Sequence, residues 1–218
     1  MIWSPVNALA RVADERRVLL GFGVTGLYAA LNLISASLLV FGGLTQAQFQ
    51  QPGGPSPTPE LVDFLPAINV FSVVFSVVAP FVQWLLVAGV MQLVTRFFGG
   101  TGPFSGMLAA VGVAQVPFVI SGAIQLPIVG LEVALGPQNT AATVAGLLSS
   151  LLGLLALLWF IVLVVIGAAF ARRVGYGESA GSCAISCAGC VGLILIVGVL
   201  FAVLIALFIG VASPNGSS

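Results

Sequence analysis

Charged residues occupy only a few short stretches of this chain, and the intervals between them are uncharged and strongly apolar. A helix needs about 20 residues to cross a hydrocarbon core about 30 Å thick. Each of five such intervals provides at least that length, so we expect an integral membrane protein. The charged residues fall at Arg11–Arg17, Glu60, Asp63, Arg96, Glu132 and Arg172–Glu178.

The overall composition supports the same class. Hydrophobic residues make up 60% of the 218 residues, charged residues only 6%, and the mean hydropathy is +1.22. Soluble proteins carry about 25% charged residues. The formal net charge is zero, so no basic surface suggests a nucleic-acid partner.

The uncharged intervals predict an all-α fold: a polytopic helical bundle with five transmembrane helices. The stretch after the first span is polar and rich in Gly and Pro, as is typical of an exposed loop. The predicted segments are an interfacial segment 1–17, a membrane domain 18–212 with spans at about 18–41, 66–96, 104–131, 143–171 and 184–212, an external loop 42–59 and an external tail 213–218.

Prolines mark where these helices should begin or bend. Pro59 is typical of a first helical residue, and a helix from there to Phe97 would exceed one bilayer crossing. Part of it is therefore expected to tilt strongly or to leave the hydrocarbon core. Pro80 is its expected kink, and Pro117 and Pro127 are expected to interrupt the third span.

The placement of arginine predicts an orientation. With five spans, every basic residue lies on one side of the membrane, as the positive-inside rule requires. We therefore expect a cytoplasmic N-terminus, an external C-terminus and a location in the cell membrane. A four-span or six-span chain would break this alternation. The basic residues are Arg11, Arg16, Arg17, Arg96, Arg172 and Arg173.

A short amphipathic helix is expected before the first span. Val6, Leu9 and Ala13 recur on one side of such a helix, with Asn7 and Arg11 opposite. This pattern favours a helix that lies on the cytoplasmic leaflet. The alternative is a disordered N-terminal segment.

No motif for catalysis is visible. The chain has no His, no nucleophile elbow and no phosphate-binding loop, and the predicted spans contain no ionisable base. The acids lie at span ends, which also disfavours proton-coupled transport. We expect no enzyme activity, no catalytic residues and no cofactor.

Uncharged polar residues are the remaining candidates inside the spans. Those in the second span recur on one helical face, and two in the third span each precede a proline by two residues. They could line a substrate path at broken helices. The favoured interpretation is structural, with hydrogen bonds between helices or to carbonyl groups that proline leaves unpaired. The candidates are Asn69, Ser72, Ser76, Gln83, Gln115 and Gln125.

Three cysteines, Cys183, Cys187 and Cys190, share one helical face near the start of the fifth predicted span. A metal site would want a fourth ligand, and the chain offers no His and no further Cys. Small neighbouring residues favour a packing seam between helices, with reversible acylation and metal binding as alternatives.

The connection between the second and third spans carries the most distinctive motif. A span ends at Gly99-Gly100, Phe104 and a small residue open the next helix, and Pro117 follows in mid-span. This pattern resembles the Yip-one (Ypt/Rab-interacting protein) domain family, in its prokaryotic branch. Further similarity lies in Trp159–Gly167, Gly177–Ala180 and Trp3-Ser4-Pro5.

The resemblance implies five spans, a cytoplasmic N-terminus and no known catalysis. Eukaryotic members bind prenylated Rab-type GTPases, largely through a long cytoplasmic N-terminal region, and act in vesicle budding and membrane shaping. Here only residues 1–17 precede the first predicted span, so GTPase binding is doubtful.

The leading hypothesis is a non-enzymatic membrane protein that scaffolds or shapes the bilayer. Its cytoplasmic surface would combine the N-terminal helix with the turns at 96–104 and 172–179. Expected partners are the lipid bilayer and, through small residues in the spans, further copies of the chain or other membrane proteins.

The alternative is a small permease or transporter subunit. Its midplane polar site would lie near Pro80 and Gln83 in the second span and near Gln115 and Pro117 in the third. A third hypothesis, less favoured, is an unusual membrane enzyme.

Overall fold

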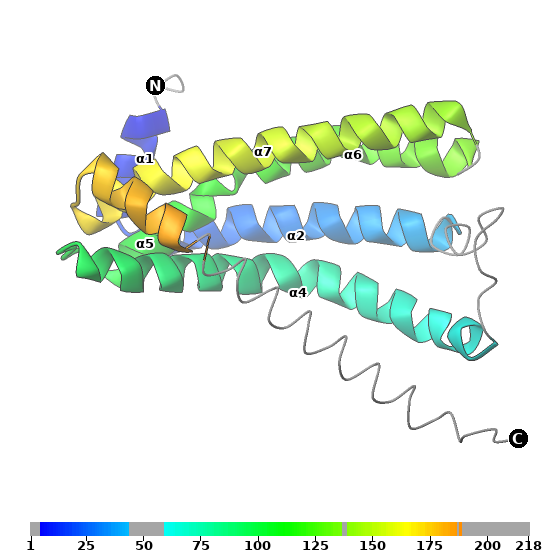
Figure 1. Ribbon diagram of the computed structural model, residues 1–218, viewed down its shortest axis with the longest axis horizontal. Coiled ribbons are helices and arrows are strands. Elements are labelled where there is room, and N and C mark those ends of the chain that lie inside the picture. Colours follow the sequence, from blue (N-terminus) through cyan, green and yellow to red (C-terminus); the bar gives the residue numbers. More distant parts are fainter. Residues whose placement is uncertain (1–4, 44–58, 137–138, 187, 189–218) are drawn as a thin grey trace, which may run out of the picture.

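The computed structural model describes residues 5–43, 59–136, 139–186 and 188, which are helical apart from short turns and contain no strand (Figure 1). This confirms the predicted all-α fold for the described part of the chain. The helices are α1 (Pro5–Asp14), α2 (Val18–Phe41), α4 (Pro59–Phe97), α5 (Phe104–Ala114), α6 (Val116–Leu135) and α7 (Thr140–Arg172), followed by a helical stretch 176–186.

The long helices run side by side along the bundle, and α1 lies across one end of it (Figure 1). α2 is central, since it packs against α4, α5 and α6. α6 and α7 form a second pair, and α1 contacts both α5 and α7. This arrangement brings α1 and the last turns of α4 and α7 to the same end of the molecule.

Within the described residues, four helices are long and apolar enough to cross a membrane, which agrees with the first four predicted spans. They are Val18–Phe41, Leu65–Phe97, Phe104–Leu135 and Thr140–Arg172. Most of the fifth predicted span, 184–212, lies outside the described residues, as do nearly all of the loop 42–59 and all of the tail 213–218.

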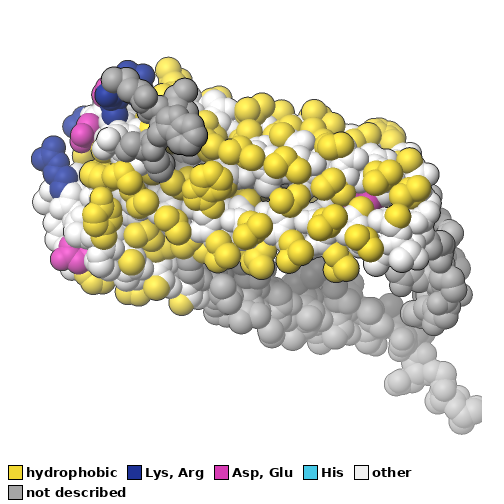
Figure 2. All heavy atoms as spheres, turned by 90° about the horizontal axis from the view of Figure 1, so that it is seen from above, with side chains coloured by type: hydrophobic (Ala, Val, Ile, Leu, Met, Phe, Trp, Pro, Cys, Tyr) yellow, Lys and Arg dark blue, Asp and Glu magenta, His cyan; other side chains and the backbone are white. Residues whose placement is uncertain are grey.

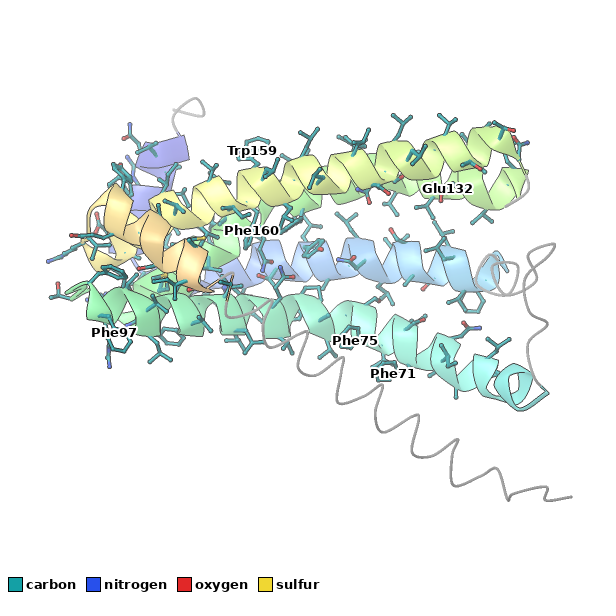
Figure 3. All side chains as sticks on the ribbon, in the orientation of Figure 1. Phe71, Phe75, Phe97, Glu132, Trp159 and Phe160 are labelled. Carbon is teal, nitrogen blue, oxygen red and sulfur yellow. The ribbon has the colours of Figure 1, made fainter. Side chains whose placement is uncertain are left out.

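Apolar side chains extend along the face of the bundle that Figure 2 shows. Leu19 is 86% exposed and Trp159 is 51% exposed, and Figure 3 shows Trp159 pointing away from the bundle. A soluble monomer rarely exposes so continuous an apolar surface. The bundle is therefore a multi-pass membrane protein whose sides face lipid.

α4 is longer than one bilayer crossing. Its 39 residues extend about 58 Å at 1.5 Å per residue, against a hydrocarbon core of about 30 Å. The helix begins at Pro59 and continues through Pro66 and Pro80 to Phe97. Figure 1 shows its first half diverging from the rest of the bundle.

The third span is divided into α5 and α6 at Gln115, where the backbone has φ −74° and ψ −4°. Pro117 follows in the first turn of α6, and its ring cannot supply a backbone N–H to the preceding turn. α6 continues through Pro127 to Leu135, so the expected interruption at Pro127 is not found.

A close crossing of α2 and α5 lies in the core. A Cβ atom added to Gly112 would be 2.4 Å from the Cα of Gly21, so the two backbones touch directly. Thr25, which is fully buried, donates its hydroxyl to the carbonyl of Gly21 at 2.9 Å. Small residues allow this approach, which gives the van der Waals contact on which membrane helices depend.

Candidate functional site

The candidate site is the end of the bundle where the arginines gather, which we call the arginine end. It comprises α1 with its junction to α2, the segment 96–104 that connects α4 to α5, and residues 172–179 at and after the end of α7. Figure 2 shows the basic side chains at this end, and Figure 3 shows Glu132 near the opposite end. The three segments are far apart in the sequence and meet here because α1 packs on α5 and α7.

Arg172 is the central residue of this end. It closes α7 and is only 2% exposed, which is rare for an arginine. Its Nε donates to the hydroxyl of Thr95 at 3.1 Å, and its two terminal nitrogens donate to the carbonyl oxygens of Gly100 and Gly102. The backbone N–H of Thr101 donates in return to the carbonyl of Arg172 at 3.1 Å.

These contacts explain how a buried guanidinium is tolerated without a carboxylate. The acceptors lie at and just beyond the C-terminal end of α4, where the helix dipole places partial negative charge. Among the described residues the structure gives one ion pair, Arg17 with Glu15, and none for Arg172. Arg172 therefore fastens the end of α7 to the turn after α4 through hydrogen bonds.

The glycines of the turn are required by its shape. Gly99 has φ +79°, in the left-handed region that favours glycine. A Cβ atom on Gly100 would lie 2.9 Å from the carbonyl oxygen of Thr95. One on Gly102 would lie 1.7 Å from the carbonyl oxygen of Ala171, so no side chain fits between this turn and α7.

α1 is fastened to the same end. Leu9 and Ala13 are buried and belong to the core cluster, whereas Asn7 and Arg11 are exposed. A Cβ atom on Gly106 would lie 3.0 Å from the carbonyl oxygen of Ala13, which shows how closely α1 and α5 approach. We expected this helix to lie on the leaflet. In the structure, Leu9 and Ala13 on its apolar face instead pack on the bundle.

The helical stretch 176–186 packs against α7 and α4 near the arginine end. Ser179 donates its hydroxyl to the carbonyl of Val165 in α7 at 2.6 Å, and Ser186 lies 3.4 Å from the sulfur of Met91 in α4. Cys183 is buried in the core cluster. Cys187 and Cys190 lie outside the described residues.

The family-motif positions lie at the start and in the middle of the third span. Phe104 is the first residue of α5 and is partly exposed at the arginine end. Pro117 is fully buried near the break between α5 and α6.

The structure does not join the polar candidates of the spans into one cluster. Gln125 donates to the carbonyl of Ser149 in α7 at 3.2 Å, and the carbonyl of Asn69 accepts from Ser72 within α4. Gln115 is 0% exposed, and neither polar atom of its side chain has a hydrogen-bond partner. None of the hydrogen bonds described for these residues links Gln83 or Gln115 to another candidate.

Sequence reasoning missed the burial of Arg172 and the role of Gly102. Arg172 was counted as one more charge at a span end. No local pattern in the sequence joins Arg172 to this turn, because the contacts span 70 to 77 residues. Among the described residues, no group of His, Cys, Asp and Glu could hold a metal ion.

The family model described as the Yip1 domain matches residues 1–199, which is most of the chain and includes the whole arginine end. No curated protein and no solved structure matches the chain.

Proposed function

The chain belongs to the Yip1 domain family, and on that basis we propose that it is a non-enzymatic protein that organises or shapes the membrane it spans. Members of this family are membrane-organising proteins and are not known as enzymes. The specific proposal is that the arginine end acts as a rigid platform at the membrane surface, through which the protein associates with other membrane components.

The observation that carries the proposal is the fastening of three separate segments into one surface. Arg172 ties α7 to the turn at Gly100 and Gly102, and α1 lies against α5 and α7 with Leu9 and Ala13 buried. A surface held by buried contacts keeps its shape, as a scaffold requires.

The orientation is part of the same proposal. All six arginines belong to the arginine end, and the positive-inside rule favours the cytoplasm for such an end. We therefore propose a cytoplasmic N-terminus and α1, in a chain of five spans located in the cell membrane. The proposed function does not include the GTPase binding of eukaryotic members.

Association with further copies or with other membrane proteins is supported by the apolar outer side of α4. Phe71 and Phe75 stack on the outer face of α4 with ring centroids 5.7 Å apart, and both point away from the bundle (Figure 3). Such a face is suited to lipid and to another apolar helix alike.

Site-specific photo-crosslinking in native membranes tests the proposal. Photoreactive residues would replace Arg11 and Tyr176 at the arginine end and, as matched exposed controls, Leu154 and Leu155 on the lipid-facing side of α7. We expect protein adducts from the arginine end at higher yield than from the controls. Recovery of monomers alone at every position would refute the scaffold.

The permease remains the second candidate because of Gln115. A fully buried amide without a partner, at a broken helix, is the arrangement from which transporters build substrate sites. Flux through liposomes that contain the purified chain would test it. If replacement of Gln83 and Gln115 by Leu left a measured flux unchanged, the site would be wrong.

A further inference from the structure

The arginine end carries more positive charge than its carboxylates balance. In the described part of the chain only Arg17 forms an ion pair, with Glu15. Glu178, the acid nearest in sequence to Arg172, instead accepts a hydrogen bond from the backbone N–H of Gly175 at 2.9 Å. Its carboxylate is therefore used to begin the helical stretch 176–186.

Two exposed arginines flank the buried Arg172. Arg96 lies in the last turn of α4, and Arg173 ends α7 with a left-handed φ of 56°. Both side chains are exposed, and no described carboxylate pairs with either of them. Arg96 directly follows Thr95, whose hydroxyl accepts from Arg172, so the backbones that carry Arg96 and Arg173 meet at this contact.

Three hydrogen bonds hold the guanidinium of Arg172 in place, so this side chain cannot move outward to pair with an anion at the surface. Carbonyl and hydroxyl acceptors stabilise its charge but leave the net charge unchanged. The surface formed by Arg96 and Arg173 therefore has a persistent positive potential and lacks a protein anion opposite it.

Aromatic side chains mark the depth of this surface in the membrane. Phe97, the last residue of α4, is 88% exposed and points outward from the bundle, as Figure 3 shows. Tyr176 is 54% exposed and makes an edge contact with Phe170 of α7, with ring centroids 6.1 Å apart. Tyr concentrates at the level of lipid headgroups, so Tyr176 favours a position of Arg173 and the adjoining surface at the level of lipid phosphates.

We propose that Arg96 and Arg173 form a binding surface for the headgroup phosphates of anionic phospholipids in the adjacent leaflet. The arginine fork matches two phosphate oxygens at once, and the guanidinium gives up its hydration more readily than an ammonium. This deepens the proposed function, because it names the membrane component that the platform gathers around itself.

Lipid is the source of the phosphate because the surface is continuous with the exposed apolar side of α4. Leu93 is 62% exposed and Phe97 is 88% exposed, so apolar side chains suited to acyl chains reach the end of α4 at Arg96. The headgroup phosphate of a bound phospholipid would pair with the arginines, and its acyl chains would cover the exposed Phe97. A soluble phosphate could pair with the arginines but could not cover Phe97.

The test uses the full chain, purified in a neutral detergent and supplied with known mixtures of phosphatidylglycerol and phosphatidylcholine. Retained lipids are counted by native mass spectrometry for the wild type, the double variant Arg96→Gln/Arg173→Gln and the double variant Arg96→Lys/Arg173→Lys. Thermal unfolding in phosphatidylcholine alone checks that each variant is folded, which is expected because both side chains are exposed.

We expect the wild type to prefer phosphatidylglycerol and the double Gln variant to lose about thirtyfold of that preference, since each basic residue near an anionic surface contributes about fivefold. The Lys variant should keep most of it, and added salt should weaken it. An unchanged preference in the Gln variant would overturn the proposal. Competition by glycerol phosphate at concentrations as low as those of the lipid would overturn it too, because the site would then be one for soluble phosphate.

This result is separable from the platform itself. Lipid retention is measured on the purified chain, whereas the platform is tested by protein crosslinks in native membranes. Crosslinks with no lipid preference would refute the lipid surface alone, and lipid preference with no crosslinks would refute the scaffold alone.

Discussion

Replacing Gly102 by alanine should be among the most damaging methyl additions in the described part of this molecule. The φ angle of Gly102 lies outside the left-handed region, so alanine fits the backbone conformation and only space opposes it. The new Cβ would lie 1.7 Å from the carbonyl oxygen of Ala171 and 3.1 Å from the Cα of Arg172. Both neighbours are backbone atoms, which cannot rotate away.

The size of the effect follows from two terms. Overpacking of a close contact costs about 1–3 kcal/mol. Moving the turn also separates the carbonyl of Gly102 from the guanidinium of Arg172, and a lost hydrogen bond to a charged group costs about 1.5–3 kcal/mol. Together these destabilise the folded state by about 2.5 to 6 kcal/mol, which lowers the melting temperature by roughly 5 to 24 °C for a chain of this size.

The assay is the fraction of monodisperse protein that survives heating in detergent, measured by fluorescence-detected size exclusion. Gly89→Ala is the matched control, because a Cβ atom there meets nothing within 4 Å in the middle of α4. That control should melt at or slightly above the wild-type temperature, since alanine is favoured over glycine in helices. Equal melting of the Gly102 and Gly89 variants would refute the described contact between the turn and α7.

Three further substitutions test the same packing. Arg172→Lys should lower the melting temperature by several degrees because an ammonium cannot reach Thr95 and both glycine carbonyls at once, and wild-type melting of this variant would contradict the fastening role. Gln115→Leu should melt at or above the wild-type temperature, because its buried amide has no partner to lose, and a clear fall would show that the amide has one. Replacing Gly99 and Gly100 together by Val should reduce the yield of folded protein in membranes, because Gly99 has φ +79° and Gly100 lies against Thr95, and undiminished yield would be the opposing result.

The spans could be predicted because a charge deficit over about 20 residues has few alternatives to a membrane helix. The start of α4 at Pro59 and the division of the third span near Pro117 also follow from the geometry of proline. Pro127 shows the limit of that reasoning, since α6 continues through it. Other helices, ordered water and local adjustments can satisfy the groups that a proline frees.

The arginine end could be predicted only in part. The glycine turn was recognisable from the resemblance to the Yip-one domain family, but its closest contact involves Gly102, which that motif does not single out. The burial of Arg172 depends on hydrogen bonds across 70 to 77 residues of sequence, which no local periodicity encodes. Likewise, the pattern of Leu9 and Ala13 predicts an apolar face without saying which surface covers it.

The most direct test of the account is the sidedness of cysteine labelling in intact cells. Single cysteines would replace Arg96, Arg173 and Thr140 in a background from which Cys183, Cys187 and Cys190 have been removed. Since α4 and α7 both end at the arginine end and α7 begins at the other, Arg96 and Arg173 should be labelled only from the cytoplasm and Thr140 only from outside. Labelling of Arg96 and Arg173 from opposite sides of the membrane would contradict the account.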